Sequence, residues 1–337
     1  MSTMLRVAIN GFGRIGRSVA RIIFTRVDIE LVAINDVTTA QMMLYLFKND
    51  SVHGSFNGDV ELLDDDYLKI GSSKVKLLFK NSPKEIDFAK YGAHTVLECS
   101  GKFLESSDVQ PHIDNGISQV IFSAVAKDET PTFVLGVNSE DYQGQKIISN
   151  ASCTTNCLAP IAKIIDDNFG LERAFVTTIH SYTGDQNLLD SKHLRDLRRA
   201  RAAAINMIPT TTGAAVGVNK VLPYMNGRIS GHSIRVPTPN VSMVDLNIVL
   251  KKSTTVDEIN FLFKHAQDGT LKGILLVDEQ MRVSSDFIGS SYSSIICSDL
   301  TQVIEENFIK VMAWYDNEFG YANRLVDMAL YIWGRKE

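Results

Sequence analysis

Residues Leu5–Gly16 read LRVAINGFGRIG, a continuous apolar run followed by three glycines spaced as GxGxxG. The run Leu5–Asn10 is typical of a strand that is buried on both faces. Arg14–Arg26 then carries its apolar residues at helical spacing, and Ile29–Asn35 (IELVAIN) is a second apolar run. Strand, glycine turn, helix and strand in this order predict the opening of a parallel sheet.

The same alternation continues through the first half of the chain. Amphipathic segments separate further short apolar runs that we expect to be strands: His94–Cys99, Gln119–Ser123 and Thr132–Val137. We therefore predict an α/β domain of the Rossmann type, in which helices cover both faces of a parallel sheet.

The pattern changes after about Ser149. Cys153–Phe169 is predicted to be one helix. Arg173–Tyr182 and Gly231–Lys251 alternate and are rich in Val, Ile and Thr, as antiparallel strands are. Three more elements are predicted: a helix opened by the capping box Thr255–Glu258, a strand at Phe308–Tyr315 and a helix at Gly320–Trp333. The second half should form an α+β domain with a mainly antiparallel sheet.

Composition limits the classes of function. The chain has 337 residues, 45% hydrophobic and 22% charged, which suits a folded globular protein. It has no apolar run of the roughly 18–20 residues that a membrane span needs, so no membrane partner is expected. The formal net charge of −5 disfavours nucleic acid as the primary partner. Four cysteines are too few for a disulfide framework and indicate a reducing, cytosol-like compartment.

The glycines and one acidic residue predict a dinucleotide site. Gly11 permits a tight turn, Gly13 lets backbone approach a pyrophosphate, and Gly16 lets the helix pack on the strand. Asp36 follows the second strand, 20 residues beyond Gly16, where a carboxylate binds ribose hydroxyls. Taken alone, Asp36 is equally explained as a turn residue or a helix cap. With the glycines it indicates NAD, because an acid repels the 2′-phosphate of NADP.

Cys153 stands in the polar stretch Ser149–Cys157, at the predicted start of a helix. Free N–H groups and the helix dipole stabilise a thiolate there, and the hydroxyls of Ser152 and Thr154 flank it. The alternative is a small apolar core residue, the commonest role of cysteine. Cys157 lies one helical turn after Cys153, so a redox pair or half of a metal site must be considered. Because Cys157 leads into an apolar run, we expect its side chain to face the core. No other spacing suits metal ligands, so no metal is predicted.

His180 ends the apolar run Phe175–Ile179 and precedes a polar segment. A lone histidine is more often structural than catalytic. At a strand end, in a chain with an exposed thiol, it becomes a candidate base for Cys153. Whether the two side chains meet depends on the fold.

Three segments carry donors suited to anions. Thr210–Gly213 is a hydroxyl-rich turn before an apolar helix, although a helix cap is the simpler role for any one of these threonines. Arg235 lies inside a strand pattern and needs a partner there. The third segment is a basic stretch, which is either a solvated surface or a phosphate site, with Lys192, Arg195, Arg198, Arg199 and Arg201.

Together these parts predict one reaction. A thiolate adds to an aldehyde and forms a thiohemiacetal, and a base takes the hydroxyl proton as hydride leaves for a nicotinamide, which gives a thioester. Two anion sites would hold a phosphorylated substrate and the phosphate that attacks the thioester. We therefore expect an aldehyde to be oxidised to an acyl phosphate.

Six motifs resemble those of the phosphorylating glyceraldehyde-3-phosphate dehydrogenase family, in its order and spacing. They cover both halves of the chain and read INGFGRIGR, SNASCTTNCLAP, HSYTGDQ, LRRARAAAINMIPTTTGAA, RVPTPNVSMVDL and WYDNEFGYANR. The resemblance implies a cytoplasmic homotetramer that converts glyceraldehyde 3-phosphate, inorganic phosphate and NAD to 1,3-bisphosphoglycerate. It implies an NAD-binding domain at 1–152 and a catalytic domain at 153–316, with a helix at about 317–337 that packs back on the first.

The resemblance also implies a role for individual residues. Cys153 would be the nucleophile and His180 the base, and the segment Tyr182–Arg201 would reach across a subunit interface. NAD would be held, besides the glycines, by Arg14, Ile15, Asp36, Ser123 and Asn317. The substrate's C3 phosphate would meet Thr183, Asp185 and Arg235, and the inorganic phosphate would meet Ser152, Thr154, Arg199, Thr212 and Gly213.

Some alternatives stay open at this stage. Erythrose-4-phosphate dehydrogenase is a near relative, but it usually departs from SYTxxQ and TTTG, which this chain keeps. Ser191-Lys192 replaces the Leu-Pro or Gly-Pro that is frequent in members specific for NAD, whereas Val37 replaces the Thr of dual-cofactor members. We expect a preference for NAD with tolerance of NADP. The rival classes are a cysteine hydrolase and an NAD-sensing or RNA-binding regulator that uses the basic stretch.

Overall fold

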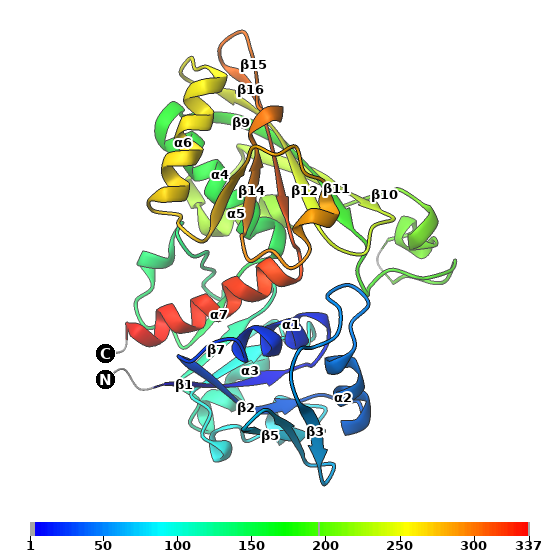
Figure 1. Ribbon diagram of the computed structural model, residues 1–337. Helices are drawn as coiled ribbons and strands as arrows, with labels where there is room; N and C mark the ends of the chain where they lie inside the picture. Colours follow the sequence, from blue (N-terminus) through cyan, green and yellow to red (C-terminus); the bar gives the residue numbers. More distant parts are fainter. Residues whose placement is uncertain (1–3, 195, 336–337) are drawn as a thin grey trace. The chain divides into compact units, whose positions relative to one another are not determined.

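A computed structural model describes residues 4–194 and 196–335. Arg195, part of the basic stretch, lies outside the described residues. The chain divides into two compact units, each with its own sheet (Figure 1). The first unit includes residues 4–135, 141–151 and 322–335, and the second includes 136–140, 152–194 and 196–321.

The first unit contains an eight-stranded sheet in the order β3-β4-β5-β2-β1-β6-β7-β8. Six strands run parallel, namely β1 (Leu5–Asn10), β2 (Ile29–Asn35), β5 (Ser73–Leu78), β6 (Thr95–Glu98), β7 (Gln119–Phe122) and β8 (Ile147–Ser149). An antiparallel pair, β3 (Val60–Leu63) and β4 (Tyr67–Ile70), extends one edge. This confirms the predicted Rossmann-type sheet.

Four helices accompany this sheet. They are α1 (Arg14–Ile23), α2 (Ala40–Lys48), α3 (Ser106–Asp114) and α7 (Phe319–Gly334), which joins the first unit from residue 322 onward. Two contacts tie α7 to this unit: an ion pair of 3.0 Å between Arg26 and Asp327, and the Trp333 ring stacked on His94.

The apolar pattern located β1 and β2 to the residue, but the strand expected at Thr132–Val137 was wrong. Only Thr132 forms a bridge, with Ser149 of β8. Gly136 has a φ of +78° within a turn, which ends the extended segment early. At this position the apolar run predicted burial of the chain correctly, but it did not predict a strand.

The second unit contains a sheet in the order β10-β11-β9-β12-β16-β14-β13, with β15 paired to β16. Most neighbours are antiparallel, as predicted. The strands are β9 (Leu171–Ser181), β10 (Ile208–Thr210), β11 (Ile229–Val236), β12 (Ser242–Leu250), β13 (Leu275–Asp278), β14 (Ser294–Cys297), β15 (Gln302–Ile304) and β16 (Phe308–Tyr315).

Helices pack on one face of this second sheet (Figure 1). The long helix α4 (Cys153–Phe169) crosses β9, β12, β14 and β16, while α5 (Ala214–Val221) contacts β11 and α6 (Val256–Asp268) contacts β13. The expected capping box begins α6, where Thr255 and Glu258 exchange hydrogen bonds. No described helix has both the length and the apolar character of a membrane crossing.

One pairing in this sheet differs from the expectation and matters for the site. The segments Arg173–Tyr182 and Gly231–Lys251 were expected to be antiparallel, but β11 runs parallel to β9. A long excursion between the two strands makes the parallel pairing possible. In this register Arg235 lies opposite His180.

The glycine turn after β1 yields a stability prediction. A Cβ on Gly16 would lie 2.1 Å from the Gly11 carbonyl oxygen, whereas a Cβ on Gly13 would meet nothing within 4 Å. Gly16→Ala should therefore lower the free energy of unfolding by roughly 1–3 kcal/mol. Gly13→Ala is the matched control and should leave stability unchanged in the absence of NAD.

The two variants are compared by urea unfolding with and without NAD. Gly13→Ala should lose most of the stabilisation that NAD gives the parent chain, because its methyl group would enter the space where a pyrophosphate approaches backbone. Equal stability of both variants without NAD would contradict the packing role of Gly16.

Candidate active site

A pocket of about 230 Å³ lies at the carboxyl ends of β1, β2 and β6 in the first unit. In open α/β sheets this is where ligands bind. Gly11 turns the chain there with a φ of +94°, which an L-residue adopts only under strain, and a Cβ would lie 2.4 Å from the Ser100 nitrogen. The pocket is lined by Asn10, Gly11, Gly13, Asn35, Asp36 and Ser100, among others.

Asp36 lines this pocket with a carboxylate fixed by backbone. One oxygen accepts from the Phe12 N–H at 2.6 Å and the other from the Thr38 N–H at 3.0 Å. Asp36 thus serves as the turn residue that one interpretation expected, and its binding of ribose hydroxyls stays a prediction. The open space over Gly13 and the acid at Asp36 together fit an adenine dinucleotide without a 2′-phosphate.

The other expected cofactor residues have distinct surroundings. Arg14, in the first turn of α1, forms an ion pair of 2.6 Å with Asp50, and Ile15 beside it is half-buried. Ser123 follows β7 and donates its N–H to the Glu98 carbonyl at 2.9 Å. Asn317 belongs to the second unit, where its Oδ1 accepts from Ser242 at 2.7 Å.

Sequence reasoning missed a buried polar network under the glycine turn. Glu98 is fully buried and accepts from Asn10 Nδ2 at 2.5 Å and from the Ser100 N–H at 2.8 Å. Asn35 Nδ2 in turn donates to Asn10 Oδ1 at 2.8 Å. Burial raises the pKa of Glu98 to about 7, despite these donors. The network joins the ends of β1, β2 and β6. In the sequence, its only signal was an acidic residue at the end of a buried strand.

In the second unit, Cys153 begins α4 as predicted. Ser152 is the N-cap, and its hydroxyl accepts from the Thr155 N–H at 3.1 Å. The Cys153 side chain is half-buried, whereas Cys157 one turn later is fully buried, as expected. The core-residue alternative for Cys153 is therefore not supported.

His180 lies at the end of β9 and faces the thiol. Its Nε2 is 3.7 Å from the Cys153 Sγ, which makes them neighbours across 27 positions of sequence. Its Nδ1 lies 2.7 Å from the Ser181 carbonyl oxygen. Because a carbonyl only accepts, Nδ1 carries the proton, and Nε2 presents a lone pair to the sulfur.

Burial acts on both groups in favour of their neutral forms. Burial, together with the nearby Arg235 charge, lowers the pKa of His180 to about 3. Burial also raises the pKa of the Cys153 thiol, against the Thr154 hydroxyl and the Arg235 charge, which lower it. Burial thus opposes the expected stabilisation of a thiolate by the helix start. Cys153 needs an acceptor for its proton, and His180 Nε2 is adjacent.

Arg235 extends the site from the neighbouring strand. Its Nη1 donates to the Ser181 carbonyl at 3.1 Å and to the Thr183 hydroxyl at 2.9 Å. Thr183 is hydrogen-bonded to Asp185, whose carboxylate forms an ion pair of 2.7 Å with Arg199. The residues expected at the C3 phosphate thus lie together, and Asp185 connects them to Arg199.

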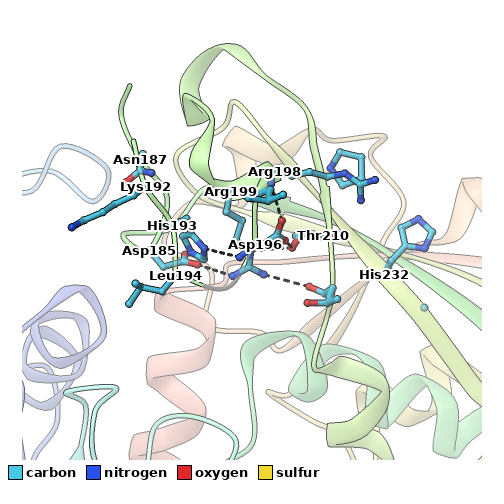
Figure 2. A pocket seen from close by; sticks show the side chains of 14 residues that line it. Asp185, Asn187, Lys192, His193, Leu194, Asp196, Arg198, Arg199, Thr210 and His232 are labelled. Atoms are coloured by element: carbon cyan, nitrogen blue, oxygen red, sulfur yellow. Dashed lines mark hydrogen bonds and ion pairs between the residues drawn. The ribbon is translucent and has the colours of Figure 1, made fainter. Parts of the chain in front are cut away.

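Arg199 belongs to a second cluster, which lines a pocket of about 1210 Å³ (Figure 2). Its Nε donates to Thr210 Oγ1 at 3.0 Å, and its Nη2 lies 3.4 Å from the Thr211 carbonyl. The turn continues to Thr212, whose hydroxyl accepts from the Ala214 N–H at 3.2 Å, and to Gly213, the N-cap of α5. Thr212 thus makes a turn hydrogen bond just before α5, whose N-cap is Gly213 and has no side-chain cap.

The first turns of α4 and α5 lie side by side. A Cβ on Gly217 of α5 would be only 2.2 Å from the Thr155 hydroxyl of α4. The start of α4 carries Ser152 and Thr154, and the start of α5 follows Thr212 and Gly213. Such a pair of helix starts favours anions.

Tyr315 is a site residue that sequence reasoning did not single out. Its hydroxyl is 2.8 Å from the Thr154 hydroxyl, and its buried ring lies edge-to-face against the His180 ring at 6.0 Å. An aromatic residue at a strand end is usually a core residue. Its position in the motif Trp314–Arg324 was the only available signal.

The described residues contain no cluster of three or more histidine, cysteine or acidic side chains that could hold a metal ion. A glycine turn with an acid after the second strand, together with a mutually neighbouring cysteine, histidine and arginine, is the arrangement expected of an NAD-dependent dehydrogenase that acts on aldehydes. Comparisons with known proteins agree with this class. Residues 5–106 match the NAD-binding domain model of glyceraldehyde 3-phosphate dehydrogenase, and residues 152–317 match its C-terminal domain model.

Curated relatives cover nearly the whole chain. A glyceraldehyde-3-phosphate dehydrogenase of Bacillus cereus is 48% identical over 98% of both chains. Those of Geobacillus stearothermophilus and Mycobacterium avium are 47% and 48% identical over 97% of this chain and 98% of theirs. The chain belongs to the glyceraldehyde-3-phosphate dehydrogenase family, and NAD is confirmed as its cofactor.

The position of His180 yields a kinetic prediction. His180→Asn should slow hydride transfer roughly 10²–10⁴-fold, because Nε2 no longer accepts a proton. Alkylation of Cys153 by iodoacetamide at neutral pH should slow as well, since the thiol loses its proton acceptor. Stopped-flow NADH formation and the alkylation rate measure the two effects. NAD affinity is the control and should not change; full activity in the variant would refute the base assignment.

Proposed function

We propose that the chain oxidises D-glyceraldehyde 3-phosphate with NAD and inorganic phosphate to 1,3-bisphosphoglycerate, with Cys153 as nucleophile and His180 as base. The observation that carries this proposal is the 3.7 Å approach of His180 Nε2 to the Cys153 sulfur, with Arg235 beside both. The first unit would hold NAD through Gly11, Gly13, Gly16, Asp36 and their neighbours. Bound NAD supplies the hydride acceptor.

The first half of the reaction makes a thioester. His180 Nε2 takes the Cys153 proton, and the sulfur bonds to the aldehyde carbon as the C=O π bond breaks toward oxygen. His180 returns the proton to that oxygen, which gives a thiohemiacetal and leaves the imidazole neutral. His180 then takes the hydroxyl proton as the C–H bond gives up its hydride with both electrons. The carbon is thereby oxidised, and its new C=O bond makes it the acyl carbon of a thioester with Cys153.

The second half releases the product. An oxygen of inorganic phosphate attacks the thioester carbon, the C–S bond breaks, and the sulfur leaves with the electron pair. Hydroxyl and backbone donors at the starts of α4 and α5, together with Arg199, would place that phosphate. The acyl phosphate that leaves is 1,3-bisphosphoglycerate.

The substrate's own phosphate is assigned to Arg235 and Thr183. A guanidinium offers a planar fork to a phosphate, and Thr183 adds a hydroxyl. Asp185 neutralises part of the positive charge between Arg235 and Arg199, which would otherwise repel each other. Triose phosphate ranks above tetrose phosphate as substrate because the chain keeps SYTxxQ and TTTG.

We also propose that the chain works as a homotetramer in the cytoplasm. The segment between β9 and β10 exposes large apolar side chains: Leu188, Leu189, Leu194 and Leu197 are all at least 74% exposed. Monomers seldom leave so many large apolar side chains together in water, so further copies of the chain are proposed to cover them. All four cysteines are free thiols, which suits a reducing compartment.

One assay tests the function. NADH formation is followed with glyceraldehyde 3-phosphate or erythrose 4-phosphate, each with and without inorganic phosphate. We expect sustained turnover only with the triose and phosphate together, and a single burst without phosphate. Cys153→Ser should abolish both while it preserves NAD binding. Amidase or esterase turnover without any NADH would instead support a cysteine hydrolase.

Asp36 gives a prediction about cofactor choice. The chain should have a higher kcat/KM with NAD than with NADP, because the fixed carboxylate repels a 2′-phosphate. Asp36→Asn, which keeps the size of the side chain, should lower the ratio of kcat/KM with NAD to kcat/KM with NADP. The variant should lose affinity for NAD and gain affinity for NADP. Comparison of kcat/KM for the two cofactors is the measurement. A parent chain whose kcat/KM with NADP equals or exceeds that with NAD would overturn this assignment.

A further inference from the structure

One acidic side chain next to the proposed phosphate pocket takes no part in the chemistry above. Asp196 lies in the segment between β9 and β10, and its two carboxylate oxygens have different partners. Oδ1 accepts from the Arg198 N–H at 2.8 Å, and Oδ2 accepts from the Thr210 hydroxyl. Arg199 Nε is 3.8 Å from the same Oδ2.

Thr210 is the shared partner of the acid and the arginine. It gives its only hydroxyl proton to Asp196 and must therefore offer a lone pair to Arg199 Nε, which donates at 3.0 Å. Asp196 thus determines the direction in which the Thr210 hydroxyl points. Figure 2 shows Asp196, Thr210 and Arg199 grouped together, whereas His232 of the same pocket lies apart.

The Arg199 guanidinium is consequently held on its Nε edge. Its Nη1 is paired with Asp185 at 2.7 Å, and its Nη2 lies 3.4 Å from the Thr211 carbonyl oxygen. A guanidinium binds phosphate well only if its plane is fixed before the anion arrives. The Asp196 carboxylate also fixes the backbone of the turn that carries Arg199 (Arg198–Ala200).

We propose that Asp196 is a positioning residue of the inorganic-phosphate site, which orients Arg199 through Thr210 without contacting the phosphate itself. The inference rests on the proposed function, because it requires a phosphate at Arg199. It goes beyond that function by assigning a role to Asp196, whose negative charge by itself would repel the phosphate. Loss of Asp196 should therefore weaken phosphate use and not strengthen it.

The test separates the two halves of the reaction in the full-length enzyme. Asp196→Asn should leave the NADH burst with glyceraldehyde 3-phosphate unchanged in rate and amplitude, since that half needs no inorganic phosphate. It should raise the KM for inorganic phosphate roughly ten-fold or more, as expected when a charge-assisted hydrogen bond is lost. Asp196→Glu, which keeps the charge, should recover part of the effect.

Asp190→Asn is the matched control. Asp190 pairs with Arg201 at 2.8 Å and accepts from the Ala202 N–H, so it makes the same kinds of contact within the same segment. This variant should keep the phosphate KM of the parent chain. Light scattering checks that all variants have the parent's size, and their unfolding midpoints check folding.

Each outcome decides the matter. A raised phosphate KM with an unchanged burst supports the role. A phosphate KM within two-fold of the parent, or equal losses in the burst and in the phosphate KM, overturns it. If Asp196→Asn does not fold, Thr210→Val replaces it and must show the same split. A parent enzyme whose turnover ignores phosphate would refute the proposed function itself, a result distinct from failure of Asp196 alone.

Discussion

The site depends on one hydrogen bond, from His180 Nδ1 to the Ser181 carbonyl at 2.7 Å. A carbonyl has no proton to give, so this contact fixes the tautomer and leaves the Nε2 lone pair facing the Cys153 sulfur. Arg235 lies 3.2 Å from the same Nδ1 and would compete as a donor, but its Nη1 already donates to Ser181 and Thr183. The arginine therefore acts on the imidazole by its charge, which opposes protonation of His180.

Burial favours the neutral forms of Cys153 and His180, the proposed nucleophile and base, and this bears on the proposed chemistry. A buried thiol is reluctant to ionise and a buried imidazole is reluctant to take a proton, as the pKa shifts of Cys153 and His180 show. Each cost falls when the charges form together, because thiolate and imidazolium then attract each other in a medium of low dielectric. In the proposed mechanism, proton transfer is therefore favoured at the moment when the sulfur attacks, and a thiolate in the resting enzyme is disfavoured.

Short sequence patterns predicted those elements whose formation depends on neighbouring residues in the chain. The strands at Leu5–Asn10 and Ile29–Asn35 and the helix at Cys153–Phe169 follow from apolar periodicity and an N-cap, and each has the expected bounds. The parallel pairing of β11 with β9 was not predictable in this way, because the direction of a neighbouring strand is set by packing across the whole sheet. Tyr315 and Asp196 were missed for a related reason, since their roles arise from contacts with residues more than a dozen positions away.

The acids near the two proposed anion sites resolve an electrostatic difficulty. Arg235 and Arg199 must both keep donors for phosphates, yet two guanidiniums near each other without counter-charge would repel and shift apart. Asp185 pairs with Arg199 and, through Thr183, is linked to Arg235, so one carboxylate serves both. Asp196 supplies the second negative charge on the far edge of Arg199.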